Sequence, residues 1–183
     1  MAQKTKKLSL SYEESEFKNE FVKNSKSDIE NDTNSKDFQK QASHEKNFKD
    51  FGFKESILKS LDKKGYLNPT PIQLAAIPEL MQGRDLLGQA QTGTGKTAAF
   101  ALPIIDKLEN NNEIKAKVLV MTPTRELATQ VADSFKSYSS ESKDLKTIAI
   151  YGGTDFRSQI SSLKRKTDIV VGTPGRIMDH IRQ

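Results

Sequence analysis

The stretch Ala90-Gln91-Thr92-Gly93-Thr94-Gly95-Lys96-Thr97 decides the fold that this sequence predicts. Gly93 and Gly95 have no Cβ, so the backbone can turn tightly and direct its N–H groups towards one point. We expect a short apolar strand at residues 85–88 before this stretch and a helix at residues 96–108 after it. A glycine-rich loop between a strand and a helix N-terminus is typical of a site for the phosphates of a nucleoside triphosphate.

Each part of this loop has an expected role. The backbone of residues 90–95 would surround the phosphates, Lys96 would reach the β- and γ-phosphates, and Thr97 would bind Mg²⁺, which makes the last two the predicted catalytic residues. The general pattern begins with Gly, whereas this chain has Ala90. A chance glycine-rich turn is the alternative, but the intact Gly-Lys-Thr and the flanking elements disfavour it. The loop indicates a nucleotide and leaves the reaction open.

Outward from the loop, short apolar runs alternate with helical patterns. Further strands are expected at residues 117–121, 147–151 and 168–171, and helices at 56–63, 71–81, 124–138, 158–164 and 175–181. Repeated strand–helix units predict an α/β fold, with a parallel sheet between layers of helices. Sites in such sheets form at the carboxyl ends of the strands.

Composition sets the boundaries of this domain and excludes several kinds of site. Residues 1–47 contain no Gly or Pro and few apolar residues, which predicts a disordered charged tail before a domain at 48–183. The chain has no Cys, and its two histidines, His44 and His180, lie far apart in the sequence, so no metal-ligand cluster is expected. The net charge of +5 fits a polyanionic partner only weakly. With no long apolar run, we expect no membrane association and a cytoplasmic location.

The segment Gly65-Tyr66-Leu67-Asn68-Pro69-Thr70-Pro71-Ile72-Gln73 resembles the Q-motif of DEAD-box RNA helicases. A Gln amide can form two hydrogen bonds with adenine, so Gln73 is expected to select this base. Tyr66 could stack on the base, and Phe48 resembles the isolated aromatic residue that the family has upstream. An ordinary helix start would explain the apolar pattern after Pro71, but not Gln73 and Tyr66 just ahead of a phosphate loop.

Three later segments resemble further motifs of the family, in the family's order. They are Pro123-Thr124-Arg125 with the following Glu126-Leu127-Ala128 (motif Ia), Gly152-Gly153 (the double-glycine motif) and Thr173-Pro174-Gly175-Arg176 (motif Ib). The resemblance implies that together they bind one RNA strand through its sugar–phosphate backbone. The basic run at residues 164–166 is read instead as a solvated helix end, with an RNA contact as the alternative.

The resemblance covers residues 48–183 and implies a RecA-like P-loop domain that uses ATP and Mg²⁺ to unwind or remodel RNA. The core segments at 87–92 and 169–173 look like those of bacterial cold-shock or ribosome-assembly helicases. No Asp-Glu-Ala-Asp motif follows Arg176, and Asp179 lacks the preceding apolar strand, so the chain is expected to be a fragment without turnover by itself. A non-catalytic nucleotide- or RNA-binding module and an unrelated P-loop ATPase are the other hypotheses. Protein partners are not indicated.

Overall fold

The computed structural model describes residues 46–110, 118–142 and 144–183. The predicted tail at 1–47 therefore lies outside the described residues, apart from Lys46 and Asn47. Asn47 caps a short 3-10 helix, η1 (Phe48–Phe51), which the sequence pattern did not predict: its side chain accepts a hydrogen bond from the backbone N–H of Lys49, and Asp50 accepts one from the backbone of Asn47. This reciprocal capping lets so short a helix form.

The centre of the fold is a parallel sheet of three strands, β1 (Val118–Met121), β2 (Thr147–Ile150) and β3 (Ile169–Gly172). The strand order is β1-β3-β2, and Ile169 lies opposite both Val118 and Thr147. The predicted parallel sheet is confirmed, with each strand within a residue or so of its expected ends.

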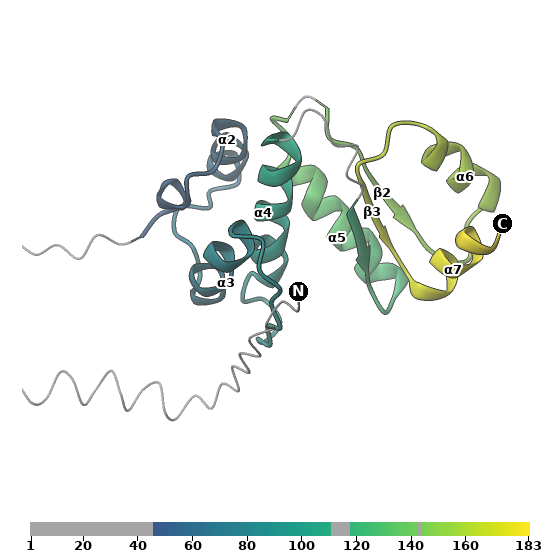
Figure 1. The fold of residues 1–183 in the computed structure, drawn as a ribbon, viewed down its shortest axis with the longest axis horizontal. Helices are drawn as coiled ribbons and strands as arrows, with labels where there is room; N and C mark the ends of the chain where they lie inside the picture. Colours follow the sequence, from purple (N-terminus) through teal and green to yellow (C-terminus); the bar gives the residue numbers. More distant parts are fainter. Residues whose placement is uncertain (1–45, 111–117, 143) are drawn as a thin grey trace, which may run out of the picture.

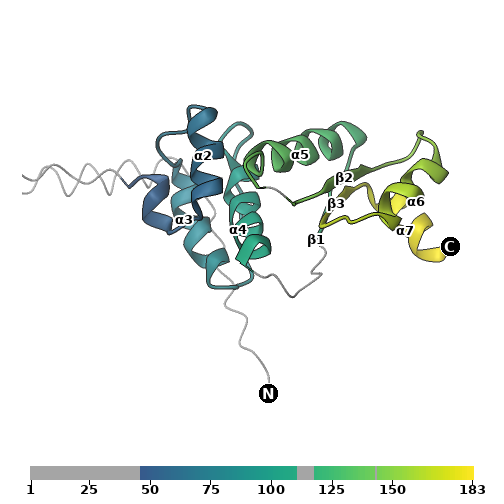
Figure 2. The same cartoon turned by 90° about the horizontal axis from the view of Figure 1, so that it is seen from above.

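Helices cover both sides of this sheet (Figures 1 and 2). On one side α5 (Arg125–Tyr138) packs against β2 and β3, and α4 (Lys96–Asn110) packs against α5. Outside α4 lie α2 (Glu55–Lys63) and α3 (Pro71–Met81). On the other side lie α6 (Phe156–Lys164) and α7 (Pro174–Arg182). This arrangement is the predicted α/β, RecA-like class.

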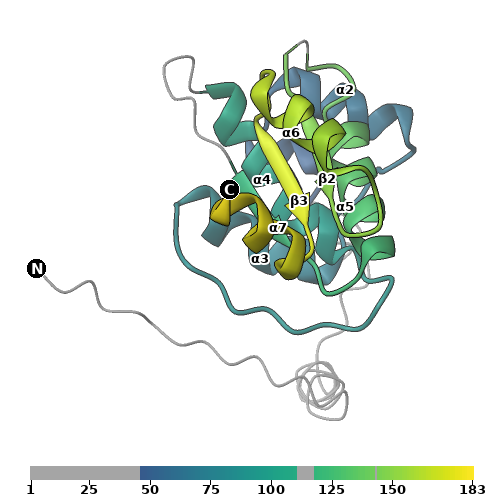
Figure 3. The ribbon, with the colours of Figure 1, turned by 90° about the vertical axis from the view of Figure 1, so that its right-hand side faces the viewer.

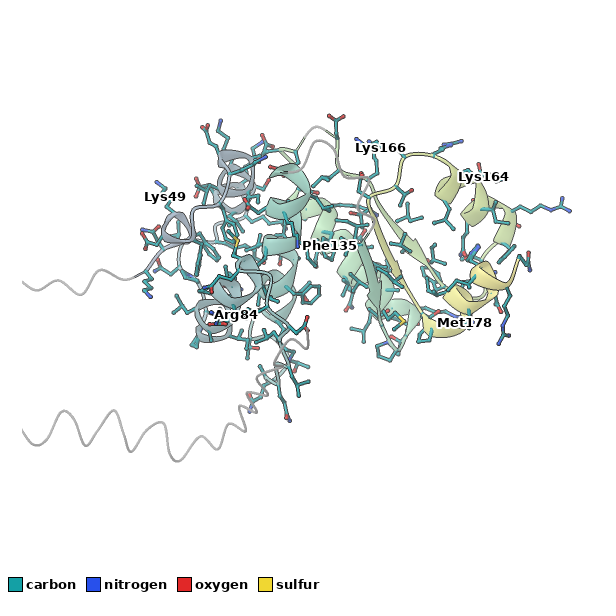
Figure 4. All side chains as sticks on the ribbon, viewed as in Figure 1. Lys49, Arg84, Phe135, Lys164, Lys166 and Met178 are labelled. Atoms are coloured by element: carbon teal, nitrogen blue, oxygen red, sulfur yellow. The ribbon has the colours of Figure 1, made fainter. Side chains whose placement is uncertain are left out.

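The core lies between α4, α5 and the inner face of the sheet. Phe135, at its centre in Figure 4, is fully buried with Leu102, Ile105, Ile169 and Val171. Small residues on α5, at positions 128 and 132, let the helix approach the strands closely. Fully burying a residue such as Phe135 or Leu102 contributes about 1.5–3 kcal/mol each.

One predicted strand is wrong. Residues 84–91 have no regular structure, and Leu86 and Leu87 are 40% and 69% exposed. Figure 3 shows this connection between α3 and α4 running outside the helices and the sheet. A strand needs a hydrogen-bonded neighbour, and the described sheet contains no partner for this apolar run.

Among the described helices, none is long and apolar enough to cross a membrane.

Candidate functional site

The predicted phosphate loop leads directly into the N-terminus of α4, as expected. Gly93 and Gly95 have φ angles of 80° and 89°, in the left-handed region that favours glycine. The Thr94 hydroxyl donates a 2.8 Å hydrogen bond to the carbonyl of Gln91, which closes the turn. Helix α4 has 15 residues, so its unpaired N-terminal N–H groups and its dipole favour an anion at this point.

Lys96, the first residue of α4, folds back over this loop. Its ammonium group donates hydrogen bonds to the carbonyls of Ala90 and Gln91, the second over 2.5 Å. Neutral carbonyls are weaker partners for an ammonium group than phosphate oxygens are. The side chain is therefore held at the loop by contacts that an anion could replace. Lys96 and Thr97 are both partly buried.

Helix α3 is joined to the loop by two side chains. The Thr70 hydroxyl donates to the carbonyl of Thr94 over 2.8 Å, and Gln73 Nε2 donates to the carbonyl of Gly95 over 3.2 Å. Gln73 Oε1 accepts from the backbone N–H of Thr70 over 3.0 Å. The structure therefore brings Gln73 and the predicted phosphate loop together. Gln73 is only 5% exposed, yet its amide retains one hydrogen and one lone pair for a further partner.

Gly95 is required for this approach between α3 and the loop. A Cβ at this position would lie 3.2 Å from Thr70 Oγ1 and 3.3 Å from Gln73 Cδ, and would collide with Gln73 Nε2. Sequence reasoning missed Thr70, although the pattern Thr70-x-x-Gln73 is a capping box and could have indicated it.

The two predicted aromatic residues lie in different places. Phe48 is 5% exposed and packs in the core, with its ring centroid 6.2 Å from that of Phe51. Tyr66 is 43% exposed, and its ring lies 6.2 Å from that of Tyr138 at the carboxyl end of α5. Burial, with a smaller contribution from Tyr66, raises the pKa of Tyr138 to about 12. Stacking of Tyr66 on a base, and a part for Phe48 in selecting adenine, stay predictions.

The predicted RNA-binding residues meet at the carboxyl edge of the sheet. Residues 122–125 follow β1, Gly152 and Gly153 follow β2, and residues 173–176 follow β3. They surround an open groove of about 620 Å³, lined by Pro123, Thr124, Arg125, Glu126, Gly152, Thr173, Gly175, Arg176 and Asp179. Pro174 is the first residue of α7 at the same edge. Because parallel strands end together, segments far apart in the sequence form one surface.

Arg125 lies across the two glycines of this groove. A Cβ on Gly153 would be 3.0 Å from Arg125 Cζ and would collide with Nη1, and one on Gly152 would be 3.5 Å from Nη2. Gly153 also has a φ of 87°. The double glycine therefore provides both the turn and the space for the guanidinium group.

Arg176 is held by a second set of contacts. Its Nη2 donates to the carbonyl of Thr154 over 3.2 Å, and Cζ lies 5.3 Å from the ring centroid of Phe156. Its Nε is buried and has no hydrogen-bond partner in the part of the chain that the structure describes. The N-cap of α7, Thr173, makes no side-chain cap bond, unlike Thr124 on α5 and Asp155 on α6. Donors are thus available for an anion at this edge.

The described residues contain no group of three or more His, Cys, Asp or Glu side chains that could hold a metal ion. Asp179 lies at the rim of the groove, on α7. The basic run at 164–166 is exposed at the end of α6, and Figure 4 shows Lys164 and Lys166 far from Met178 on α7. Exposure fits both a solvated helix end and an RNA contact, so the interpretation of this run as a solvated helix end stays a prediction.

Known proteins resemble the chain over most of its length. Residues 70–183 match the DEAD/DEAH box helicase family. The chain is 49% identical over 141 residues to the DEAD-box ATP-dependent RNA helicase RhpA of Helicobacter pylori. The matched residues make up 77% of this chain and 28% of that protein. It is 47% identical over 143 residues to the ATP-dependent RNA helicase DeaD of Escherichia coli, covering 78% of this chain and 22% of that protein.

A further relative and a solved structure agree with these matches. The ATP-dependent RNA helicase CshA of Listeria monocytogenes is 50% identical over 137 residues, covering 74% of this chain and 26% of CshA. A DEAD box protein from the hyperthermophile Methanococcus jannaschii has the same fold, with a TM-score of 0.67 and 45% identity over 74% of this chain and 37% of that one. The chain spans about a quarter of the length of the curated relatives that it matches.

Proposed function

The chain belongs to the DEAD/DEAH box helicase family, and from this we propose that it forms the ATP- and RNA-binding part of an ATP-dependent RNA helicase. The whole protein would unwind or remodel RNA duplexes at the expense of ATP. The observation that carries the proposal is the position of Gln73. An amide able to select adenine lies in hydrogen-bond contact with the loop that would hold the phosphates.

Lys96 and the loop fit a triphosphate. The lysine stands at the start of α4, and both glycines have the positive φ that allows the loop to curve around an anion. On binding, we expect the Lys96 ammonium group to leave the carbonyls of Ala90 and Gln91 for phosphate oxygens. The glycines then let backbone N–H groups approach the phosphates closely.

Thr97 would supply one oxygen to Mg²⁺. This ion keeps several waters and takes phosphate oxygens as ligands, so a single hydroxyl is a sufficient protein contribution for binding. When bound, the ion neutralises charge on the phosphates during transfer. Hydrolysis also needs a carboxylate that holds Mg²⁺ and a group that positions water.

The groove at the carboxyl edge of the sheet would bind RNA. Arg125 and Arg176 provide two positive charges beside the carboxylates of Glu126 and Asp179, and the uncapped start of α7 provides N–H donors. Contacts of this kind go to phosphates and carry no base sequence. The two sites are linked through the core, because α4 begins at the loop, α5 begins at the groove, and Phe100 and Phe135 join them with ring centroids 6.0 Å apart.

A second candidate is a module that binds nucleotide or RNA without turnover. It is compatible with the contact between Gln73 and the loop and with the open groove, both of which such a module would also use. An unrelated P-loop ATPase is disfavoured, because it would give no reason for Gln73 to contact the loop.

Competition between ATP and GTP tests the proposal. The protein at its native length should prefer ATP, and Gln73→Ala should remove this preference; Gln130→Ala, which changes an exposed Gln on α5, is the control. Turnover of ATP stimulated by RNA separates the two candidates, since a binding module would show affinity without turnover. A preference for ATP that survives Gln73→Ala would refute the assignment of the adenine site.

A further inference from the structure

A network of side chains from α6 and α7 lies behind the predicted RNA-binding groove and is not part of any motif described above. Gln159 of α6 is 9% exposed and is at its centre. Its Nε2 donates to the carbonyl of Tyr151 over 2.9 Å and to the hydroxyl of Thr154, and its Oε1 lies 3.0 Å from Nε2 of His180. Gln159 thus bridges the turn after β2 and helix α7.

The direction of these hydrogen bonds follows from the chemistry of the amide. Because Nε2 of Gln159 is the donor to Tyr151 and Thr154, its Oε1 must accept. His180 therefore donates from Nε2, which fixes its tautomer. Burial, followed by the positive charge of Arg176, lowers the pKa of His180, with Asp179 opposing the change. A neutral imidazole fits the single donor role that the geometry requires.

The same network reaches Arg176 by two routes. The ring of His180 stacks on Phe156, with centroids 4.3 Å apart and planes 10° from parallel, and the guanidinium group of Arg176 lies against the same Phe156 ring. Arg176 also donates to the carbonyl of Thr154, whose hydroxyl accepts from Gln159. The guanidinium group and the turn of residues 151–154 are therefore positioned by one set of contacts.

We infer that Gln159 and His180 are positioning residues that hold Arg176 in the geometry that binds the RNA backbone. Gln159 acts on Arg176 through Thr154, and His180 acts through its hydrogen bond to Gln159, while its ring packs on Phe156. The inference rests on the proposed function, because it concerns the same groove. Its physical basis is preorganisation: side chains fixed before binding lose less conformational entropy when the RNA arrives.

The experiment is a double-mutant cycle in the protein at its native length. The affinity for a short fluorescein-labelled oligouridine is measured in the presence of a non-hydrolysable ATP analogue. We expect Arg176→Ala and Gln159→Ala each to weaken binding by about five- to tenfold. In the Arg176→Ala background, Gln159→Ala should cause little further loss, because it acts through the residue already removed. Ser161→Ala, an exposed change on the same helix, is the control and should bind normally.

The outcomes separate this inference from the proposed function. Equal effects of Gln159→Ala with and without Arg176, or a parallel loss of affinity for the ATP analogue, would show a general structural role and overturn the positioning role. If Arg176→Ala itself binds RNA normally, the groove assignment fails first, and the positioning role with it.

A second variant covers the case in which Gln159→Ala does not fold. His180→Phe keeps a ring on Phe156 and removes only the hydrogen bond to Gln159, so it should fold and weaken RNA binding by about twofold. In the Arg176→Ala background this twofold effect should disappear. Normal affinity in His180→Phe would overturn the inference.

Discussion

At the scale of single residues, Lys96 is the side chain whose loss should separate binding from folding most clearly. Its hydrogen-bond partners are carbonyls of its own loop, so Lys96→Ala should leave the fold intact. A charged hydrogen bond to phosphate contributes about 1.5–3 kcal/mol, so nucleotide affinity should fall about ten- to a hundredfold. Titration calorimetry with ATP and circular dichroism measure the two properties. Lys107→Ala, on an exposed part of the same helix, is the control; wild-type affinity in Lys96→Ala would refute the role of the loop.

At Gly153, any side chain should lower both the stability of the fold and the affinity for RNA. Gly153→Ala would place a Cβ against the Arg125 guanidinium group and would strain a backbone with a φ of 87°. We expect a loss of about 1–3 kcal/mol in the free energy of unfolding, together with weaker RNA binding. Urea denaturation and fluorescence anisotropy measure these effects. At Gly88 a Cβ would meet only Leu86 Cδ2, at an ordinary contact distance of 4.0 Å, so Gly88→Ala should be nearly neutral. Full stability in Gly153→Ala would mean that Arg125 does not occupy this turn.

At the scale of elements, the N-terminus of α3 should couple the position of the loop to nucleotide binding. Thr70→Val removes the hydrogen bond from the Thr70 hydroxyl to the Thr94 carbonyl. We expect a loss of about 1 kcal/mol of stability and a several-fold loss of nucleotide affinity, because the loop is no longer tied to α3. Thr70→Ser retains the hydroxyl and should restore both. Equal nucleotide affinity in Thr70→Val and Thr70→Ser would show that this bond does not shape the loop.

The carboxyl end of α5 should make stability sensitive to alkaline pH. The pKa of Tyr138 is about 12 in the folded chain and about 10 when unfolded, so the unfolded state loses its proton first. The contribution of Tyr138 to the free energy of unfolding is therefore fully present below pH 10 and is lost between pH 10 and 12. After allowance for partial solvent screening, the loss should be about 1–2 kcal/mol. Urea unfolding at several pH values measures it. Tyr138→Phe should show a smaller decline over this range, and an identical decline would assign it to other groups.

The elements also show where sequence reasoning succeeds. Helices with one apolar face, such as Glu55–Lys63 and Arg125–Tyr138, and the continuous apolar run Val118–Met121 lie close to where the pattern predicts them. The spacing of apolar residues shows which face of an element is buried, and this spacing can be read from the local sequence alone. Residues 85–88 have the same apolar character but lack a neighbouring strand, so the pattern alone misled. Helix η1 was missed because its stability comes from the cap of Asn47 and not from a period.

At the scale of the whole molecule, the site was predictable where chemistry is carried by contiguous motifs. Gln73 and the loop were expected to act together, and they touch. The contacts of Gln159 and His180 could not be predicted, because they join residues 21 positions apart through packing of two helices. The strand order likewise depends on tertiary packing, since β1 and β2 are adjacent in the sequence but lie on opposite sides of β3.

The exposed edge of the sheet at β1 should make the chain self-associate. Among the described strands β1 pairs with β3 alone, and Leu119 and Met121 on one of its faces are 52% and 63% exposed. An edge with apolar side chains and unpaired backbone groups favours pairing with another chain. We expect the 183-residue chain by itself to self-associate with rising concentration, as measured by sedimentation velocity.

Met121→Lys should reduce this association, because a charge on an edge strand opposes pairing between two chains. Met178→Lys is the matched control, since Met178 is 45% exposed on α7 and not on a strand edge (Figure 4). Equal effects of the two lysines would point to general apolar contact, because edge pairing requires β1 specifically. A chain that stays monomeric at every concentration would show that this edge does not pair with another chain.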